Sequence, residues 1–302
     1  MPRHTSLGNE MSFMVECIGS MSLVIDFQKA LEESIEYKGH LEEGRSNYYS
    51  AAYAEPIKAY FSQKNVLSYE TAYNARYKCV PICAFASSAR LCYLHFRSLE
   101  EQGEPLFEAL IDNDIPCNSV PTHMDVIRNN VYYECKCQEI LSTGKSPFSV
   151  SYLRSPLFQE LGIQEARCVR KEIEQHGKVS ISYILEFPLS QLGISFSNDP
   201  DYTNLHFDLK QLISHLLAIA NTKGKEETTL AYVFYTPKAS SIKAYESVKE
   251  LYATLNKEWD AIFAEGTAIH RFIHDHRIKV LREYVDISAI RDFNYEQAYL
   301  GK

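Results

Sequence analysis

The chain has 302 residues, of which 45% are hydrophobic and 23% are charged, and its net charge at pH 7 is −8. This composition is that of a globular protein, and its acidic balance excludes a surface coated in basic charge for general nucleic-acid binding. A local basic cleft is still compatible with it. No apolar run approaches the roughly 20 residues of a membrane-spanning helix, and no secretion signal opens the chain. We therefore expect a cytoplasmic protein without a membrane partner.

None of the eight cysteines forms a Cys-x-x-Cys pair, and the spacings Cys79/Cys83 and Cys135/Cys137 do not match a structural zinc site. Several of the cysteines lie inside apolar runs. Because free cysteine behaves as a small buried apolar residue in a reducing compartment, we expect reduced thiols rather than disulfides.

The N-terminal part, residues 1–73, is predicted to be a helical support region. Residues 22–37 place apolar side chains at helical spacing: Val24, Phe27, Leu31 and Ile35. A second helix is predicted over residues 45–63, where Pro56 kinks or divides it. Further on, Ser87 is predicted to cap a buried helix, because no Gly-x-Ser-x-Gly elbow marks it as a nucleophile.

Residues 107–111 are predicted to end a helix-like run, and residues 115–120 to form a short irregular or edge strand. Two β-rich runs follow, residues 124–128 and 131–137, separated by Asn129-Asn130. Asparagine tolerates positive φ better than most residues, so this pair predicts a tight hairpin.

The hairpin carries the first candidate site. Side chains alternate faces along a strand, so Glu134 and Lys136 emerge on the same side, and hairpin pairing places Asp125 across from Glu134. Two neighbouring carboxylates repel each other unless a cation lies between them, which is typical of a divalent-metal site. A surface salt bridge is the competing interpretation, and these residues alone leave both open.

The middle of the chain alternates in character. We expect a loop over residues 141–151, a helix with a basic face over residues 168–175 and a strand over residues 179–187. Residues 205–220 form the strongest predicted helix, with Asp208, Gln211 and His215 on one flank.

Residues 228–236 follow this helix as a nearly continuous apolar strand. Together these elements indicate a mixed α/β fold. A C-terminal helical region is predicted over residues 241–302, with helices over residues 242–263 and 269–284. The second of these helices is strongly basic.

The order of the elements resembles the PD-(D/E)XK nuclease superfamily, which has the restriction-endonuclease-like fold. The resemblance rests on Asp125, on Glu134-Cys135-Lys136 and on Gln211, and segments 86–93 and 134–139 are most similar to a bacterial family of restriction-type endonucleases. The proline that commonly precedes the aspartate is absent, since Met124 stands there. The resemblance implies a nuclease core over residues 74–240, with a central mixed sheet flanked by helices.

The resemblance also implies a chemistry. Asp125, Glu134 and the backbone carbonyl of Cys135 would hold Mg²⁺ or Mn²⁺, which polarises the scissile phosphate of DNA and lowers the pKa of the attacking water. Lys136 would stabilise the developing charge, and Gln211 would keep the groups in register. Many such nucleases cut both strands as homodimers.

Several alternatives stay open. Glu139 either joins a second metal site or is a loop carboxylate, and the basic residues of segments 167–171 and 271–282 are candidates for contacts with the DNA backbone. A degenerate relative could bind nucleic acid or a protein without cleavage. A regulatory α/β protein with an accidental hairpin motif is the third interpretation.

Overall fold

The computed structural model describes residues 7–64, 81–115, 121–175, 178–198 and 200–302. A five-stranded mixed sheet lies at its centre, in the order β1-β2-β3-β7-β8. Strands β1 to β3 pair antiparallel, whereas β3, β7 and β8 pair parallel. The strands are β1 (Leu106–Ile111), β2 (Thr122–Arg128), β3 (Val131–Lys136), β7 (Thr228–Thr236) and β8 (Ile278–Asp286). The predicted mixed α/β class is confirmed.

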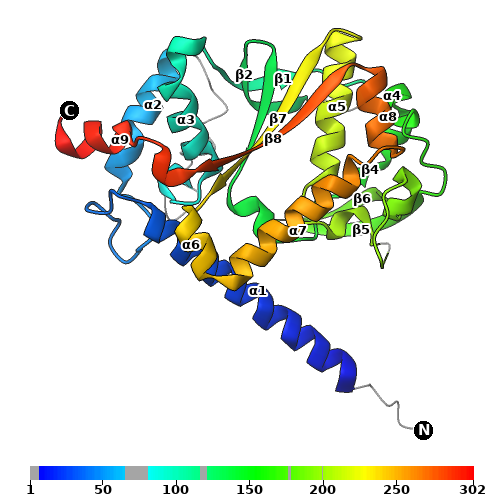
Figure 1. The fold of residues 1–302 in the computed structure, drawn as a ribbon. Helices are drawn as coiled ribbons and strands as arrows, with labels where there is room; N and C mark the ends of the chain where they lie inside the picture. The colour runs from blue at the N-terminus through cyan, green and yellow to red at the C-terminus, as the bar shows by residue number, and fades with distance from the viewer. Residues whose placement is uncertain (1–6, 65–80, 116–120, 176–177, 199) are drawn as a thin grey trace.

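Helices cover both faces of this sheet. Figure 1 shows α2 (Ala54–Gln63) and α3 (Ser88–Ser98) on one side and α5 (Leu209–Lys223) on the other. Helix α3 contacts β2 and β3, while α5 contacts β1, β2 and β7. Because β7 lies between these layers, nearly all of its side chains are buried, which explains its continuous apolar sequence.

The remaining helices frame the sheet. Helix α1 is longer than expected, and the predicted second helix begins only at Ala54, two residues before Pro56. Proline is tolerated in the first turn of a helix, where its missing N–H has no intrahelical acceptor. These helices are α1 (Leu7–Ser34), α4 (Pro156–Gln159), α6 (Ala239–Ala244), α7 (Glu246–Ile262), α8 (Ala268–Asp275) and α9 (Phe293–Tyr295).

Two segments predicted to be helical are strands, and a third is a strand in its second half only. Residues 107–111 belong to β1, whose side chains alternate between buried and exposed. Residues 168–175 belong to β5 (Arg167–Gln175), which pairs with β6 (Lys178–Glu186) along its whole length. The basic segment 269–284 is α8 followed by β8, so the C-terminal region is not wholly helical. In each case pairing with a neighbouring strand outweighs a local helical preference.

The expected strand over residues 179–187 is confirmed as β6. It lies in a second sheet of order β4-β6-β5, in which β4 (Phe148–Ser149) arises from the segment expected to be a loop. The expected strand over residues 115–120 lies outside the described residues, apart from Ile115. In the described part of the chain, no disulfide joins these five cysteines: Cys83, Cys92, Cys135, Cys137 and Cys168.

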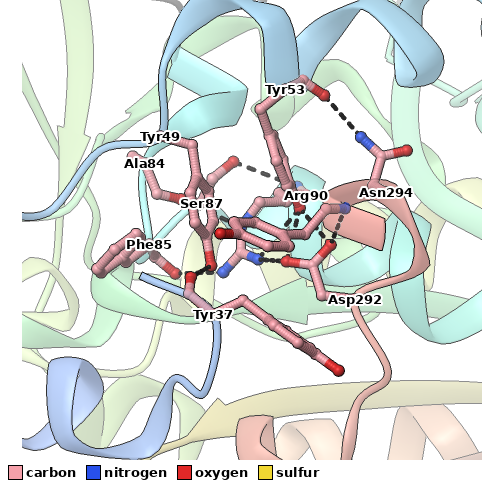
Figure 2. Close-up of polar contacts among 10 residues, drawn as sticks. Tyr37, Tyr49, Tyr53, Ala84, Phe85, Ser87, Arg90, Asp292 and Asn294 are labelled. Atoms are coloured by element: carbon pink, nitrogen blue, oxygen red, sulfur yellow. Dashed lines mark hydrogen bonds and ion pairs between the residues drawn. The ribbon is translucent and has the colours of Figure 1, made fainter. Parts of the chain in front are cut away.

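A buried ion pair joins α3 to the C-terminal segment (Figure 2). Arg90 lies 3.4 Å from Asp292 and donates hydrogen bonds to the backbone carbonyls of Ala84 and Phe85. Tyr53 donates to both oxygens of Asp292. The helix that carries Arg90 begins where predicted, because the Ser87 hydroxyl accepts a hydrogen bond from the Arg90 N–H.

None of the helices in the described part of the chain combines the length and the apolar character needed to span a lipid bilayer.

Candidate active site

The hairpin of β2 and β3 forms as predicted. Asn129 and Asn130 both have positive φ, 50° and 62°, and form the tight turn. The antiparallel register pairs Arg128 with Val131 and Val126 with Tyr133, so the next position along places Asp125 beside Glu134. Residues directly opposite each other in an antiparallel pair share a face, so both carboxylates emerge on the same side of the sheet.

The backbone ladder is interrupted at Asp125. The register of β1 and β2 skips the pair that Glu108 and Asp125 would make, and Glu108 has a left-handed φ of 51°. The pairs between β2 and β3 also end before this position. In place of a ladder bond, the Asp125 Oδ2 atom accepts a hydrogen bond of 2.7 Å from the Cys135 N–H. This bond fixes the half-buried Asp125 carboxylate beside the Glu134 strand.

Glu134 is the centre of a polar cluster. Its side chain is only 5% exposed, and its Oε1 atom lies 2.5 Å from Lys136 Nζ. The same oxygen accepts a hydrogen bond of 2.7 Å from Gln211 Nε2. Three of the residues predicted from the sequence are therefore in direct contact, and Asp125 is their neighbour across the hairpin.

Helix α5 brings Gln211 to this cluster. The helix begins after Asp208, whose Oδ1 atom accepts a hydrogen bond from the Gln211 N–H and caps the first turn. Its apolar stripe, which includes Leu212, Leu216 and Leu217, is buried and holds the helix against the sheet. The cap and the stripe together direct the Gln211 side chain toward Glu134.

Burial and nearby negative charge raise the pKa values of the two carboxylates. Burial raises the pKa of Asp125, and the charge of Glu134 raises it further. Burial also raises the pKa of Glu134, against the opposing effect of Lys136. Burial lowers the pKa of Lys136, but the carboxylates of Glu134, Glu139 and Asp125 outweigh it and raise the pKa overall. The lysine therefore stays charged between two acidic groups that repel each other.

His215 belongs to the cluster although it was not among the predicted site residues. Its Nε2 atom lies 3.6 Å from Glu134 Oε2, and its Nδ1 atom lies 3.1 Å from the Tyr232 hydroxyl. Burial, followed by the charge of Lys136, lowers the pKa of His215 to about 3, so its ring is neutral. The sequence indicates this position only through spacing, because His215 follows Gln211 by one helical turn and so shares its face of the helix.

Glu139 lies near Lys136, and its carboxylate is held by two hydrogen bonds from outside the cluster. One of its oxygens accepts a hydrogen bond of 2.7 Å from the Cys137 N–H, and the other accepts one of 2.6 Å from the Ser88 hydroxyl. The carboxylate thus links the end of β3 to the start of α3. These contacts favour the interpretation of Glu139 as a loop carboxylate over that of a metal ligand.

Two cavities border the cluster on different sides. The smaller, of about 90 Å³, is lined by Lys136, Glu139 and Asp208, among others. The larger, of about 380 Å³, is lined by Gln211 and His215, among others. Glu134 therefore contacts one residue that lines the smaller cavity, Lys136, and two that line the larger one, Gln211 and His215.

The cluster offers oxygen donors of the kind that Mg²⁺ and Mn²⁺ prefer. The carboxylates of Asp125 and Glu134 and the Cys135 carbonyl are the candidate ligands, and a divalent cation would relieve the repulsion between the two acids. Among the residues that the structure describes, no three side chains of His, Cys, Asp or Glu converge on one point that could hold an ion. Two carboxylates and water would therefore have to supply most of the ligands.

The two basic segments lie outside the cluster. Arg167 and Lys171, on β5, each lie within 4 Å of Glu186. Arg282, on β8, lies 3.7 Å from Asp260. Their contact with a DNA backbone stays a prediction.

Comparison with known proteins identifies no relative. No protein-family model matches the chain, and no match is found among curated proteins or solved structures.

Proposed function

We propose that this chain is a metal-dependent nuclease that hydrolyses phosphodiester bonds in DNA. The observation that carries the proposal is the contact of Glu134 with both Lys136 and Gln211, beside a second carboxylate, Asp125, on the same face of the sheet. A surface salt bridge would leave the pair exposed. Glu134 is instead buried and lies between two cavities.

The order and pairing of the elements support a restriction-endonuclease-like core. Helix α3 is followed by the antiparallel strands β1, β2 and β3, and then, after an inserted second sheet, by α5 and the parallel strand β7. The aspartate, the Glu-x-Lys pair and the glutamine lie on β2, β3 and α5 in turn. This is the sequence of elements on which the resemblance to the nuclease superfamily rests.

The residues suit the steps of phosphodiester hydrolysis. A divalent cation, when bound, supplies an activated water and polarises the scissile phosphate. Lys136 holds a positive charge beside the carboxylates, where it can neutralise charge that develops on the phosphate. Gln211 holds Glu134 Oε1, and Oε2 lies 3.6 Å from His215, a residue that lines the larger cavity. The Cys135 N–H holds Asp125 in position.

The test is cleavage of plasmid DNA and of a single-stranded oligonucleotide, with Mg²⁺, with Mn²⁺ and with a chelator. We expect cleavage that requires the metal and falls by about 10²-fold or more in Lys136→Ala, because that variant loses a charge aimed at the transition state. Lys225→Ala, an exposed lysine beyond α5, is the control and should cut at the wild-type rate. Equal activity of Lys136→Ala and wild type would show that the assignment is wrong.

A second candidate is a protein that binds nucleic acid without cutting it. The observation that favours it is that Glu134 Oε1 and Asp125 Oδ2 are already occupied by protein donors, with no third acidic or histidine ligand among the described residues. DNA binding by the wild-type protein, with no cleavage under any metal condition, would select this candidate.

A further inference from the structure

The two cavities beside Glu134 differ in size. The smaller has room for a few water molecules, since each occupies roughly 30 Å³ in the liquid. The larger, at about 380 Å³, falls in the range of small-ligand sites. Only the larger cavity can therefore take a nucleotide unit.

The cavities also differ in charge. The smaller is lined by two carboxylates and two lysines, so its charges cancel: Glu139, Asp208, Lys136 and Lys145. The lining of the larger includes no Asp or Glu among the described residues, and it contains Lys210. Because Asp208 and Lys210 stand on either side of the start of α5, this first turn separates a space of balanced charge from one whose lining carries a net positive charge.

Lys210 is placed to contact a phosphate. It lies in the first helical turn of α5, where the helix dipole adds positive character. In the described part of the chain, no carboxylate forms an ion pair with it. The larger cavity adds the amide of Gln211. His123 lines it too, with its Nδ1 atom 4.0 Å from Glu108.

We propose that the larger cavity binds the sugar-phosphate backbone of the substrate DNA strand, with Lys210 as its anchoring cation. The inference rests on the proposed nuclease function and names the side from which the strand reaches Glu134. The smaller cavity is left for water. Lys210 acts here by binding the strand, and it takes no part in the bond-breaking step.

The experiment measures binding of a labelled single-stranded DNA oligonucleotide by fluorescence anisotropy, in chelator, over a range of salt concentrations. All variants carry Glu134→Gln so that no strand is cut. We expect Lys210→Ala to weaken binding by at least about tenfold at low salt, because a charge-assisted contact with a phosphate is lost. The slope of log affinity against log salt should fall in magnitude by about 0.7, the value for one phosphate on a single strand.

Two matched variants make the result specific. Lys210→Arg keeps the charge and should bind as the background protein does. Lys225→Ala removes the charge of an exposed lysine just beyond the C-terminal end of the same helix and should leave both affinity and slope unchanged. Equal losses in Lys210→Ala and Lys225→Ala, or an unchanged slope in Lys210→Ala, would overturn the proposal.

The outcomes separate this inference from the nuclease proposal. If the wild-type protein cleaves DNA but Lys210→Ala does not change binding, the proposed role of the larger cavity is wrong and the nuclease proposal stands. If binding depends on Lys210 and the wild-type protein does not cleave DNA, the larger cavity is still the binding site and the nuclease proposal is wrong. Absence of binding by every variant, together with absence of cleavage by the wild-type protein, overturns both.

Discussion

Arg90 and Glu134 are both buried charged residues, and they differ in how neighbouring groups balance their charge. Arg90, with a side chain 3% exposed, pairs with one carboxylate, Asp292, and donates its other hydrogen bonds largely to backbone carbonyls. The positive charge of Arg90 is balanced by the negative charge of Asp292, and the other acceptors are backbone atoms (Figure 2). A cavity of about 260 Å³ lies beside this pair as well, so an adjacent space does not distinguish the two regions.

At Glu134 two acids share one lysine, so the charge is not balanced when both acids are ionised. Lys136 and Gln211 come from β3 and α5, and the second carboxylate, Asp125, shares the single lysine. An excess of buried negative charge lowers stability unless a ligand compensates it. The comparison teaches that the balance of charge, more than burial, separates a structural cluster from a candidate site in this protein.

The largest expected effect is on the Arg90 cluster. Arg90→Leu should lower the free energy of unfolding by about 3–5 kcal/mol, because it leaves the Asp292 carboxylate buried without a cation. Urea unfolding followed by circular dichroism measures it. Arg167→Leu, at a side chain 81% exposed, is the control and should unfold at nearly the wild-type urea concentration. A stable Arg90→Leu protein would mean that the pair does not hold the C-terminal segment.

The next effect concerns the candidate site. Gln211→Ala should reduce the cleavage rate by about 10- to 100-fold, because a hydrogen bond to a charged group contributes about 1.5–3 kcal/mol. The free energy of unfolding should change much less than in Arg90→Leu. Gln102→Ala, an exposed glutamine, is the control. A Gln211→Ala enzyme with the wild-type rate would remove Gln211 from the mechanism.

A smaller effect, of opposite sign, is expected at Asp125. In the folded state its pKa is raised, so the folded protein holds this proton more tightly than the unfolded chain does. Wild-type stability in chelator should therefore fall as pH rises from about 5 to about 8. Asp125→Asn keeps an acceptor for the Cys135 N–H and removes this loss, so it should stabilise the metal-free protein by about 1 kcal/mol at the upper pH.

Urea unfolding at several pH values measures this difference. A variant with the same pH dependence as wild type would show that burial and Glu134 do not raise the pKa of Asp125. The same substitution should abolish cleavage, which separates stability from activity at this one position.

The smallest effect is expected at an ion pair outside both regions. Lys249 lies 2.9 Å from Glu246 on the exposed face of α7. Exposed pairs of this kind contribute little because water and salt screen them. Lys249→Ala should change neither unfolding nor cleavage measurably. A clear loss of stability would mean that exposed ion pairs contribute more to the free energy of unfolding than expected here.

The amino-acid sequence by itself determined the parts of the site that local rules control. The Asn129–Asn130 turn sets the hairpin register, and alternation along the strands places Asp125, Glu134 and Lys136 on one face. The spacing of apolar residues predicts the helix that carries Gln211, although the helix begins at Leu209, after Asp208, and not at residue 205. These features depend on residues close together in the chain, so they can be predicted without the fold.

The tertiary structure decided what depends on distant partners. Strands β1, β5 and β8 were predicted to be helical, because their sequences form strands only when a neighbouring strand supplies the hydrogen bonds.

Arg90 and Asp292 are 202 residues apart in the chain, and no local pattern relates them. The approach of His215 to Glu134 and the position of Lys210 at the larger cavity likewise follow from how α5 packs on the sheet. Packing is decided by the whole core, which no short segment encodes.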